Sequence, residues 1–196
     1  NSASIVISDA YSNTLSLAFS GDSVSMLTRI DGSEIDYAYN GERLATVTQP
    51  NNQTIPYHYD DTAAPNRISG ITNELGKRTI SWSYAVIDGV EKAIRSYGDT
   101  IDGVVQNDFI FDYDSAGETT VTGPLGRENT YHYKQVNGSL KVFEIDRAAC
   151  PSGSCSAATK YYEYNAQGLL ANRTDWRGNV TAFEYNNAGQ ETKRTV

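Results

Sequence analysis

The side chains best suited to catalysis or metal binding are few in this sequence, which has two His and two Cys among its 196 residues. His58 and His132 each stand in the middle of a Tyr-His-Tyr triplet. In other aromatic-x-aromatic triplets the same middle position is held by Ala38, Ser83, Asp112, Glu163 and Glu184. Because a position that accepts such different side chains tolerates solvent, we predict no catalytic or metal-binding role for either His.

The two cysteines, Cys150 and Cys155, lie close together in the segment CPSGSC. This spacing fits either half of a zinc site or a small disulfide loop. No His or second Cys pair lies near enough in sequence to complete a zinc shell. We therefore favour a Cys150–Cys155 disulfide, which is typical of an exported protein.

Other catalytic sites leave no recognisable pattern in the sequence. A nucleophile elbow, a P-loop, a dinucleotide-binding fingerprint and an EF-hand loop are all missing. The Asp residues that can be placed stand in turns, which leaves a weak calcium site at clustered turns as an alternative. The sequence thus predicts no enzyme, no metal and no cofactor.

Two tryptophans are the candidates for binding a carbohydrate or a partner protein. Trp176 stands in the turn sequence DWRG, beside Arg177, where an exposed indole could stack on a sugar ring. The alternative, which we favour, is that the indole folds over the neighbouring hairpin. Trp82 occupies the first aromatic position of its triplet, so packing is the favoured role there too.

The elements that position these residues are expected to be short strands of a repeat. The second aromatic of each triplet, here called the anchor aromatic, recurs with a base period of about 20 residues. The anchor aromatics are Phe19, Tyr39, Tyr59, Tyr84, Tyr113, Tyr133, Tyr164 and Tyr185. Longer intervals mark insertions near 85–108 and 146–160. We predict a single array over residues 1–196, with about seven to eight units.

Turn residues separate the predicted strands. Asn or Asp often follows the anchor and Gly often stands three positions later, as in Asn165 and Gly168. The Asx side chain opens a turn, and Gly supplies the positive φ that a type I turn with a bulge requires. Asn40-Gly41 is expected to form a two-residue turn with positive φ at both positions. The insertion after Tyr84 is either a loop or an extra hairpin.

The predicted fold is all-β, a repetitive antiparallel hairpin meander that forms a twisted, curved sheet. The composition agrees, since 14 Tyr and 16 Gly favour pleated strands and tight turns. The two aromatics of a triplet share one face of the sheet, so we expect a ladder of cross-strand aromatic pairs.

The segment YEYNAQGLLANRTDWRGNVTAFEYN resembles the YD repeat of the Rhs family, whose relatives include bacterial toxin-complex shell proteins and the animal teneurins. The resemblance covers essentially the whole chain and weakens only in the two insertions. It implies a sheet that spirals into a hollow shell, which in bacteria often encloses a C-terminal toxin. It also implies export or surface attachment, and carbohydrate binding has been attributed to such repeats.

The function expected from these observations is a non-catalytic structural segment of a larger secreted or cell-surface protein. Its partners would be adjacent repeats and an enclosed domain of the same polypeptide. The alternative is a carbohydrate-binding surface module that uses exposed Tyr and Trp. The net charge of −8 argues against nucleic acid or an anionic membrane as a partner. Membrane insertion is not expected, because no stretch approaches about 20 apolar residues.

Overall fold

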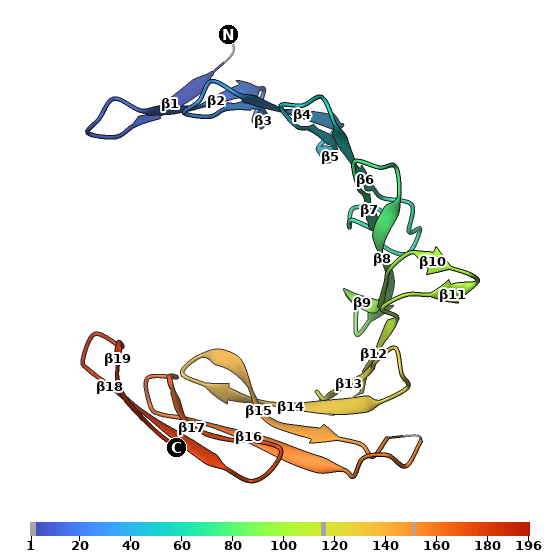
Figure 1. The fold of residues 1–196 in the computed structure, drawn as a ribbon, viewed down its shortest axis with the longest axis vertical. Coiled ribbons are helices and arrows are strands. Elements are labelled where there is room, and N and C mark those ends of the chain that lie inside the picture. Colours follow the sequence, from blue (N-terminus) through green and yellow to red (C-terminus); the bar gives the residue numbers. More distant parts are fainter. Residues whose placement is uncertain (1–2, 115–116, 151) are drawn as a thin grey trace. The chain divides into compact units, whose positions relative to one another are not determined.

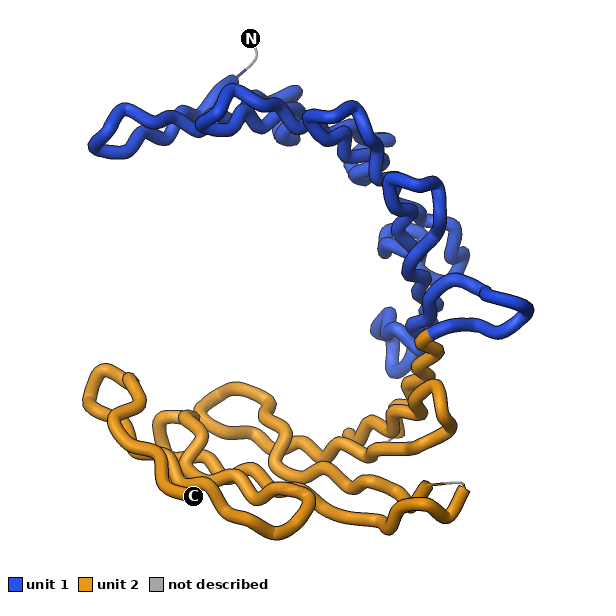
Figure 2. Tube along the Cα trace, in the orientation of Figure 1, with its two compact units in different colours: residues 1–106 blue, residues 107–196 orange. Residues whose placement is uncertain are grey.

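The structure is a computed structural model that describes residues 3–114, 117–150 and 152–196 (Figure 1). Within these ranges the chain consists of strands and turns, with no helix and therefore no helix that could cross a membrane. The predicted all-β fold is confirmed. The chain divides into two compact units, residues 1–106 and 107–196 (Figure 2), which we describe separately. That the whole chain is one repeat array stays a prediction.

Unit 1 is an antiparallel meander in which every strand from β1 to β8 pairs with the next along the chain. A separate two-stranded hairpin, β10–β11, follows it. The strands are β1 (Ser4–Ser8), β2 (Thr14–Ser20), β3 (Ser23–Thr28), β4 (Glu34–Asn40), β5 (Arg43–Thr48), β6 (Thr54–His58), β7 (Gly70–Thr72), β8 (Arg78–Ile87), β9 (Val90–Tyr97), β10 (Thr100–Ile101) and β11 (Val104–Val105).

Unit 2 follows the same rule, and each of its strands from β12 to β18 pairs antiparallel with the next. The strands are β12 (Phe109–Tyr113), β13 (Thr119–Thr122), β14 (Glu128–Val136), β15 (Ser139–Arg147), β16 (Ala158–Tyr164), β17 (Leu170–Thr174), β18 (Val180–Tyr185) and β19 (Glu191–Thr195). The predicted hairpin meander is therefore present in both units.

The insertion after Tyr84 consists of hairpins. Asp88 and Gly89, with φ of 54° and 75°, form the two-residue turn between β8 and β9. Asp102 and Gly103, with φ of 50° and 79°, do the same between β10 and β11. Positive φ at both central residues is the type I′ geometry, whose twist matches that of the flanking strands.

The turn predicted at Asn40-Gly41 is placed one residue too early. Asn40 pairs with Arg43 at the ends of β4 and β5, so Gly41 and Glu42 are the central residues. Only Gly41 of the two has a positive φ, 63°. This is the type II′ pattern, which needs Gly at the first central position and accepts an ordinary residue at the second. The prediction of positive φ at both positions was wrong.

The Asx-x-x-Gly turns form as predicted. At Asp175, one carboxylate oxygen accepts hydrogen bonds from the backbone N–H of Arg177 at 2.8 Å and of Asn179 at 2.9 Å. Gly178 closes the turn with φ of 86°. A bond from the Asn179 side chain to the other carboxylate oxygen, at 3.0 Å, is the main cause that holds the pKa of Asp175 below its usual range, and the two backbone bonds add to it. The turn is thus specified by residues within five positions of one another.

The anchor aromatics stand at β-bulges, which the sequence did not reveal. The register shifts immediately before six of them, namely Phe19, Tyr39, Tyr84, Tyr133, Tyr164 and Tyr185. In each case the partner strand carries the extra residue. A bulge increases the local twist and bends the strand, so the repeat places its bend at the same point in successive hairpins.

The expected ladder of aromatic pairs is wrong. A ring–ring contact joins His132 and Phe143, which are not anchor aromatics. Consecutive anchors lie on every second strand, roughly 9.5 Å apart, which is too far for rings to touch. Hydroxyl groups make the link instead: Tyr185 donates to the carbonyl of Leu170 at 2.8 Å, and Tyr164 donates to that of Val142 at 2.7 Å.

These hydroxyl bonds follow a rule. Leu170 is the residue that pairs with the preceding anchor, Tyr164. Val142 likewise pairs with the preceding anchor, Tyr133. In unit 1 the hydroxyl of Tyr39 donates at 2.9 Å to Val24, which pairs with Phe19. Each of these tyrosines therefore fastens its own hairpin to the one before it.

The hydrophobic core is small. Among the described residues the buried apolar side chains are Ile35, Val47 and Ala64. Most strand residues are half-buried, as in β3 and β13, where every position is intermediate. This is the burial expected of a one-layer sheet with solvent on both faces.

Candidate functional site

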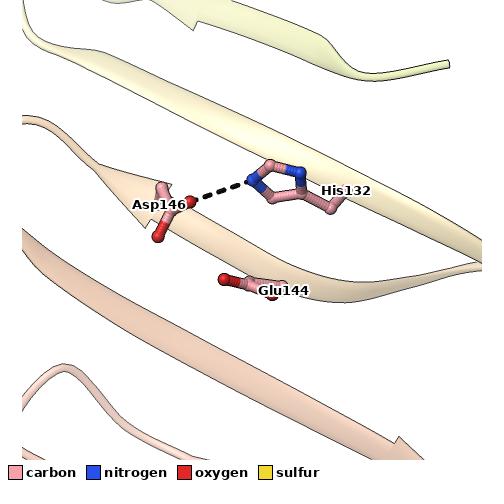
Figure 3. Close-up of side chains that lie close together, drawn as sticks. All are labelled: His132, Glu144 and Asp146. Carbon is pink, nitrogen blue, oxygen red and sulfur yellow. Dashed lines mark hydrogen bonds and ion pairs between the residues drawn. The ribbon is translucent and has the colours of Figure 1, made fainter. Parts of the chain in front are cut away.

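The most distinctive cluster of titratable groups surrounds His132 on β14. Its Nδ1 lies 2.6 Å from Oε1 of Glu118, which directly precedes β13. Its Nε2 lies 3.0 Å from Oδ2 of Asp146 on β15 (Figure 3). The His132 side chain is 18% exposed, against 37% for Glu118 and 47% for Asp146. Three consecutive segments of the meander thus converge on one imidazole.

The register of the sheet explains this convergence. His132 pairs across the ladder with Glu144 on β15, and Asp146 is two positions further along that strand on the same face. Asp146 pairs in turn with Thr159 on β16, whose hydroxyl donates to its Oδ1 at 2.6 Å. The cluster therefore occupies one polar face that crosses β13, β14, β15 and β16.

Electrostatics at the cluster favour a charged imidazole. Burial alone would lower the pKa of His132, but its hydrogen bonds to Glu118 and Asp146 outweigh that effect and raise it. The pKa of Asp146 is lowered, mainly by the Thr159 hydroxyl and further by His132, while burial opposes these effects. His132, Glu144 and Asp146 each offer a ligand atom, and these atoms lie within 4.8 Å of one another, so the three could hold a metal ion.

The sequence analysis missed this cluster because neither partner is near His132 in the chain. Glu118 and Asp146 are each 14 positions away, one before and one after. His58, in the same position of its own repeat, has a different neighbour: its Nε2 lies 2.7 Å from the hydroxyl of Thr72. The repeat position alone does not decide what surrounds the ring.

A second polar network lies in unit 1. Arg78 on β8 donates to both carboxylate oxygens of Asp60, at 2.7 and 3.1 Å, and to the carbonyl of Ser69 at 2.7 Å. The Ser69 hydroxyl also donates to Asp60. Arg78, and then Ser69, hold the pKa of Asp60 far below its usual range. The guanidinium lies directly over Gly70, where any Cβ would collide with it.

The binding candidates from the sequence lie in different units. Trp176 is half-buried, with the Arg147 guanidinium 4.8 Å and the Lys160 ammonium 5.7 Å from its ring. These cation–π contacts place the indole over the preceding hairpin. Arg177 is exposed in the same turn.

Trp82 lies on β8 in unit 1 and is half-buried. It lines a cavity of about 490 Å³ together with Arg78, Asp60, Tyr97 and Asp99. The cavity walls are mostly polar and charged. Trp82 therefore lies next to the hydrogen-bond network of Arg78. No pattern in the sequence had predicted that the two would be neighbours.

The two cysteines form the expected disulfide. Cys150 and Cys155 are bonded, with their Cα atoms 5.1 Å apart. Arg127 donates from Nη2 to Cys150 Sγ at 2.8 Å and also contacts Cys155 Sγ. Pro151, inside this loop, lies outside the described residues.

Comparison with known proteins agrees with the repeat. Residues 162–196 match the family model of the RHS repeat. A chain in the crystal structure of TcdB2-TccC3-Cdc42 resembles 89% of this chain, with a TM-score of 0.56 and 13% identity. Both findings support an Rhs/YD-repeat family. This Rhs-repeat chain covers only 10% of that larger chain, and at such identity the likeness shows a shared fold.

Two further comparisons add little about the Rhs-repeat chain. A porin-like protein from Bacteroides uniformis aligns with 99% of it and 87% of its own length, at 10% identity and a TM-score of 0.44. That score is too low to carry an argument. No curated protein sequence matches the chain.

Proposed function

We propose that this Rhs-repeat chain is a non-catalytic wall segment of a larger exported protein. In that protein its sheet would help to enclose or present another domain of the same polypeptide. The proposal rests on the family and on one physical observation, namely how little of the sheet is buried.

The exposed surface supports a wall rather than a self-sufficient domain. The chain exposes 12,804 Å². A compact protein of its mass, 21.5 kDa, would expose roughly 9,200 Å². The excess agrees with a one-layer sheet whose faces are both open. Such a sheet gains stability when neighbouring repeats or an enclosed domain cover it.

The outermost strands of the two units support the same proposal. All five residues of β1 and all five of β19 are exposed, whereas the interior strands are mostly half-buried. Exposed strands of this kind are places where a sheet extends by pairing. Further hairpins of the same repeat would cover them without any change in the pairing rule.

Export is supported by the Cys150–Cys155 disulfide, since such bonds persist in oxidising compartments. The carbohydrate-binding alternative is not favoured. The indole of Trp176, its best candidate, is already in contact with Arg147 and Lys160. A glycan would have to displace these cations in order to stack on the ring.

The test uses the full-length polypeptide that contains this segment. A site for a specific protease would be introduced between the repeats and the neighbouring domain, and the cleaved protein would be analysed by native mass spectrometry. A wall that encloses its partner retains the cut domain and protects it from a second, non-specific protease. Release of that domain in a freely digestible form would contradict the proposal. Glycan binding that is lost in Trp176→Ala would support the alternative.

A further inference from the structure

The geometry points to a binding site for a divalent transition-metal cation of the Zn²⁺ class on the polar face of unit 2. Its ligands would be His132 Nε2 and one carboxylate oxygen each from Asp146 and Glu144. The sequence predicted no metal for this chain, because the three residues come together only through the pairing of β14 with β15.

The ligand set suits this class of cation. Imidazole nitrogen and carboxylate oxygen together bind Zn²⁺ and similar ions at about 2.0–2.2 Å. Ligands around such an ion stand roughly 3.4 Å apart in a tetrahedron. His132 Nε2 and Asp146 Oδ2 are already 3.0 Å apart, and the full set lies within 4.8 Å. Glu144 therefore needs to approach by at most about 1.4 Å, a movement that rotation of a half-buried Glu side chain can supply.

The ligands are already oriented by their neighbours. Glu118 accepts a hydrogen bond from Nδ1 of His132, so Nε2 faces the two carboxylates. This is the usual outer support of a metal-binding His, in which a carboxylate holds the far ring nitrogen. The Thr159 hydroxyl likewise holds Asp146 through Oδ1 and leaves Oδ2 toward His132. Figure 3 shows Glu144 beside this pair without a bond to either residue.

Charge also favours a cation at this position. Glu118, Glu144 and Asp146 surround a single imidazole, so even a protonated His132 leaves a local excess of negative charge. Arg147 and Lys160 are next in sequence to Asp146 and Thr159, so their side chains point to the other face. Both have their charged groups over Trp176. Lys134 has its ammonium over the ring of Phe143, 5.3 Å from the centroid.

The proposed site is open to solvent, so a cation could bind and leave reversibly. Asp146 is 47% exposed and Glu118 37%, so the carboxylates around His132 are open to solvent. A cation can therefore reach it from solvent, displacing the proton between Nε2 and Asp146 into the buffer. Once bound, the ion would join β14 to β15 through side chains as well as through the backbone ladder.

The test is a titration of the full chain with Zn²⁺ by isothermal calorimetry, and with Co²⁺ by visible absorption. We expect one ion per chain and a Co²⁺ spectrum with nitrogen and oxygen ligation. His132→Gln should abolish binding, and Glu144→Gln should weaken it at least tenfold. Glu118→Gln, which weakens the support of the ring and removes one nearby negative charge, should weaken it about tenfold. Ca²⁺ and Mg²⁺ should bind far less tightly, because they prefer all-oxygen sites.

The matched control is His58→Gln, which removes the other His from the same position of its repeat. His58 faces the Thr72 hydroxyl rather than a carboxylate, so its loss should leave the titration unchanged. Glu144→Gln guards against a folding artefact, because Glu144 makes no bond to His132 that the fold depends on. The proposal is overturned if the wild-type chain binds no Zn²⁺, if His132→Gln or Glu144→Gln binds it as tightly, or if His58→Gln weakens it equally.

Discussion

Gly70 provides the sharpest test of how the unit 1 network is built. In the structure the Arg78 guanidinium lies over Gly70 and would collide with a Cβ there. The backbone of Gly70 is not in the left-handed region, since its φ does not fall among the positive values. The three atoms nearest to such a Cβ all belong to Arg78, so Gly70→Ala should be opposed mainly by that side chain, which would have to leave its hydrogen bonds.

The expected loss of stability in Gly70→Ala can be calculated from the hydrogen bonds that Arg78 would lose. The Arg78–Asp60 pair is partly exposed, at 33% and 60%, so it contributes only about 0.5–1 kcal/mol. The bond from Arg78 to the carbonyl of Ser69 is better shielded, because Ser69 is 1% exposed, and contributes about 1.5 kcal/mol. Gly70→Ala should thus lower the free energy of unfolding of unit 1 by about 2 kcal/mol.

The assay is a double-mutant cycle by urea denaturation. Trp82 lines the same cavity as Arg78, so its fluorescence reports unit 1 when Trp176 is replaced by Phe. In an Arg78→Ala background, Gly70→Ala should cost less than about 0.5 kcal/mol, which gives a coupling energy of about 1.5–2 kcal/mol. Equal costs in the two backgrounds would refute the reasoning. Gly123→Ala is a control in unit 2, because its Cβ would meet its nearest neighbours at an ordinary 3.7 Å; there Trp176 reports unfolding when Trp82 is replaced by Phe.

Three further predictions concern single side chains. Arg78 lowers the pKa of Asp60 in the folded chain, so this carboxylate stabilises unit 1 fully above its unfolded-state pKa near 3.9, and the stabilisation is lost as the pH falls below that value. In Asp60→Asn the free energy of unfolding of unit 1, followed by Trp82 fluorescence, should therefore decrease less steeply with acid. Tyr185→Phe removes the bond to Leu170 and should cost about 0.5–1.5 kcal/mol in urea denaturation of unit 2, whereas no loss would show that the hydroxyl contributes nothing. Gly178→Ala, with φ of 86° but open space around it, should cost about 1 kcal/mol by the same measurement, and Gly178→Asn should cost less.

The part of the fold that could be predicted is the part encoded by neighbours in sequence. Asp175 and Gly178 form their turn from backbone groups within five residues, so the Asx-x-x-Gly pattern was sufficient. The alternation of turns and short strands was then sufficient to predict the antiparallel meander. At Asn40-Gly41 the same pattern misplaced the turn, because Gly41 alone satisfies a type II′ geometry when it stands first.

The part that could not be predicted depends on register. A bulge before Tyr133 and the pairing of His132 with Glu144 decide which side chains meet. Neither feature can be recognised from the sequence around these residues. The same is true of the anchor hydroxyls, whose carbonyl partners lie 15 to 22 positions away. The proposed metal site belongs to this category, since its three ligands meet only through the pairing of β14 with β15.

The anchor hydroxyls give the array a direction. Tyr39, Tyr164 and Tyr185 each donate to the strand that precedes their own, so the acceptor carbonyl is always made earlier during synthesis. A chain that emerges from the ribosome N-terminus first therefore presents a finished docking point to each new hairpin. The sheet can therefore form in the order of synthesis, with each of these three hairpins docking on the one before it and none waiting for a distant segment.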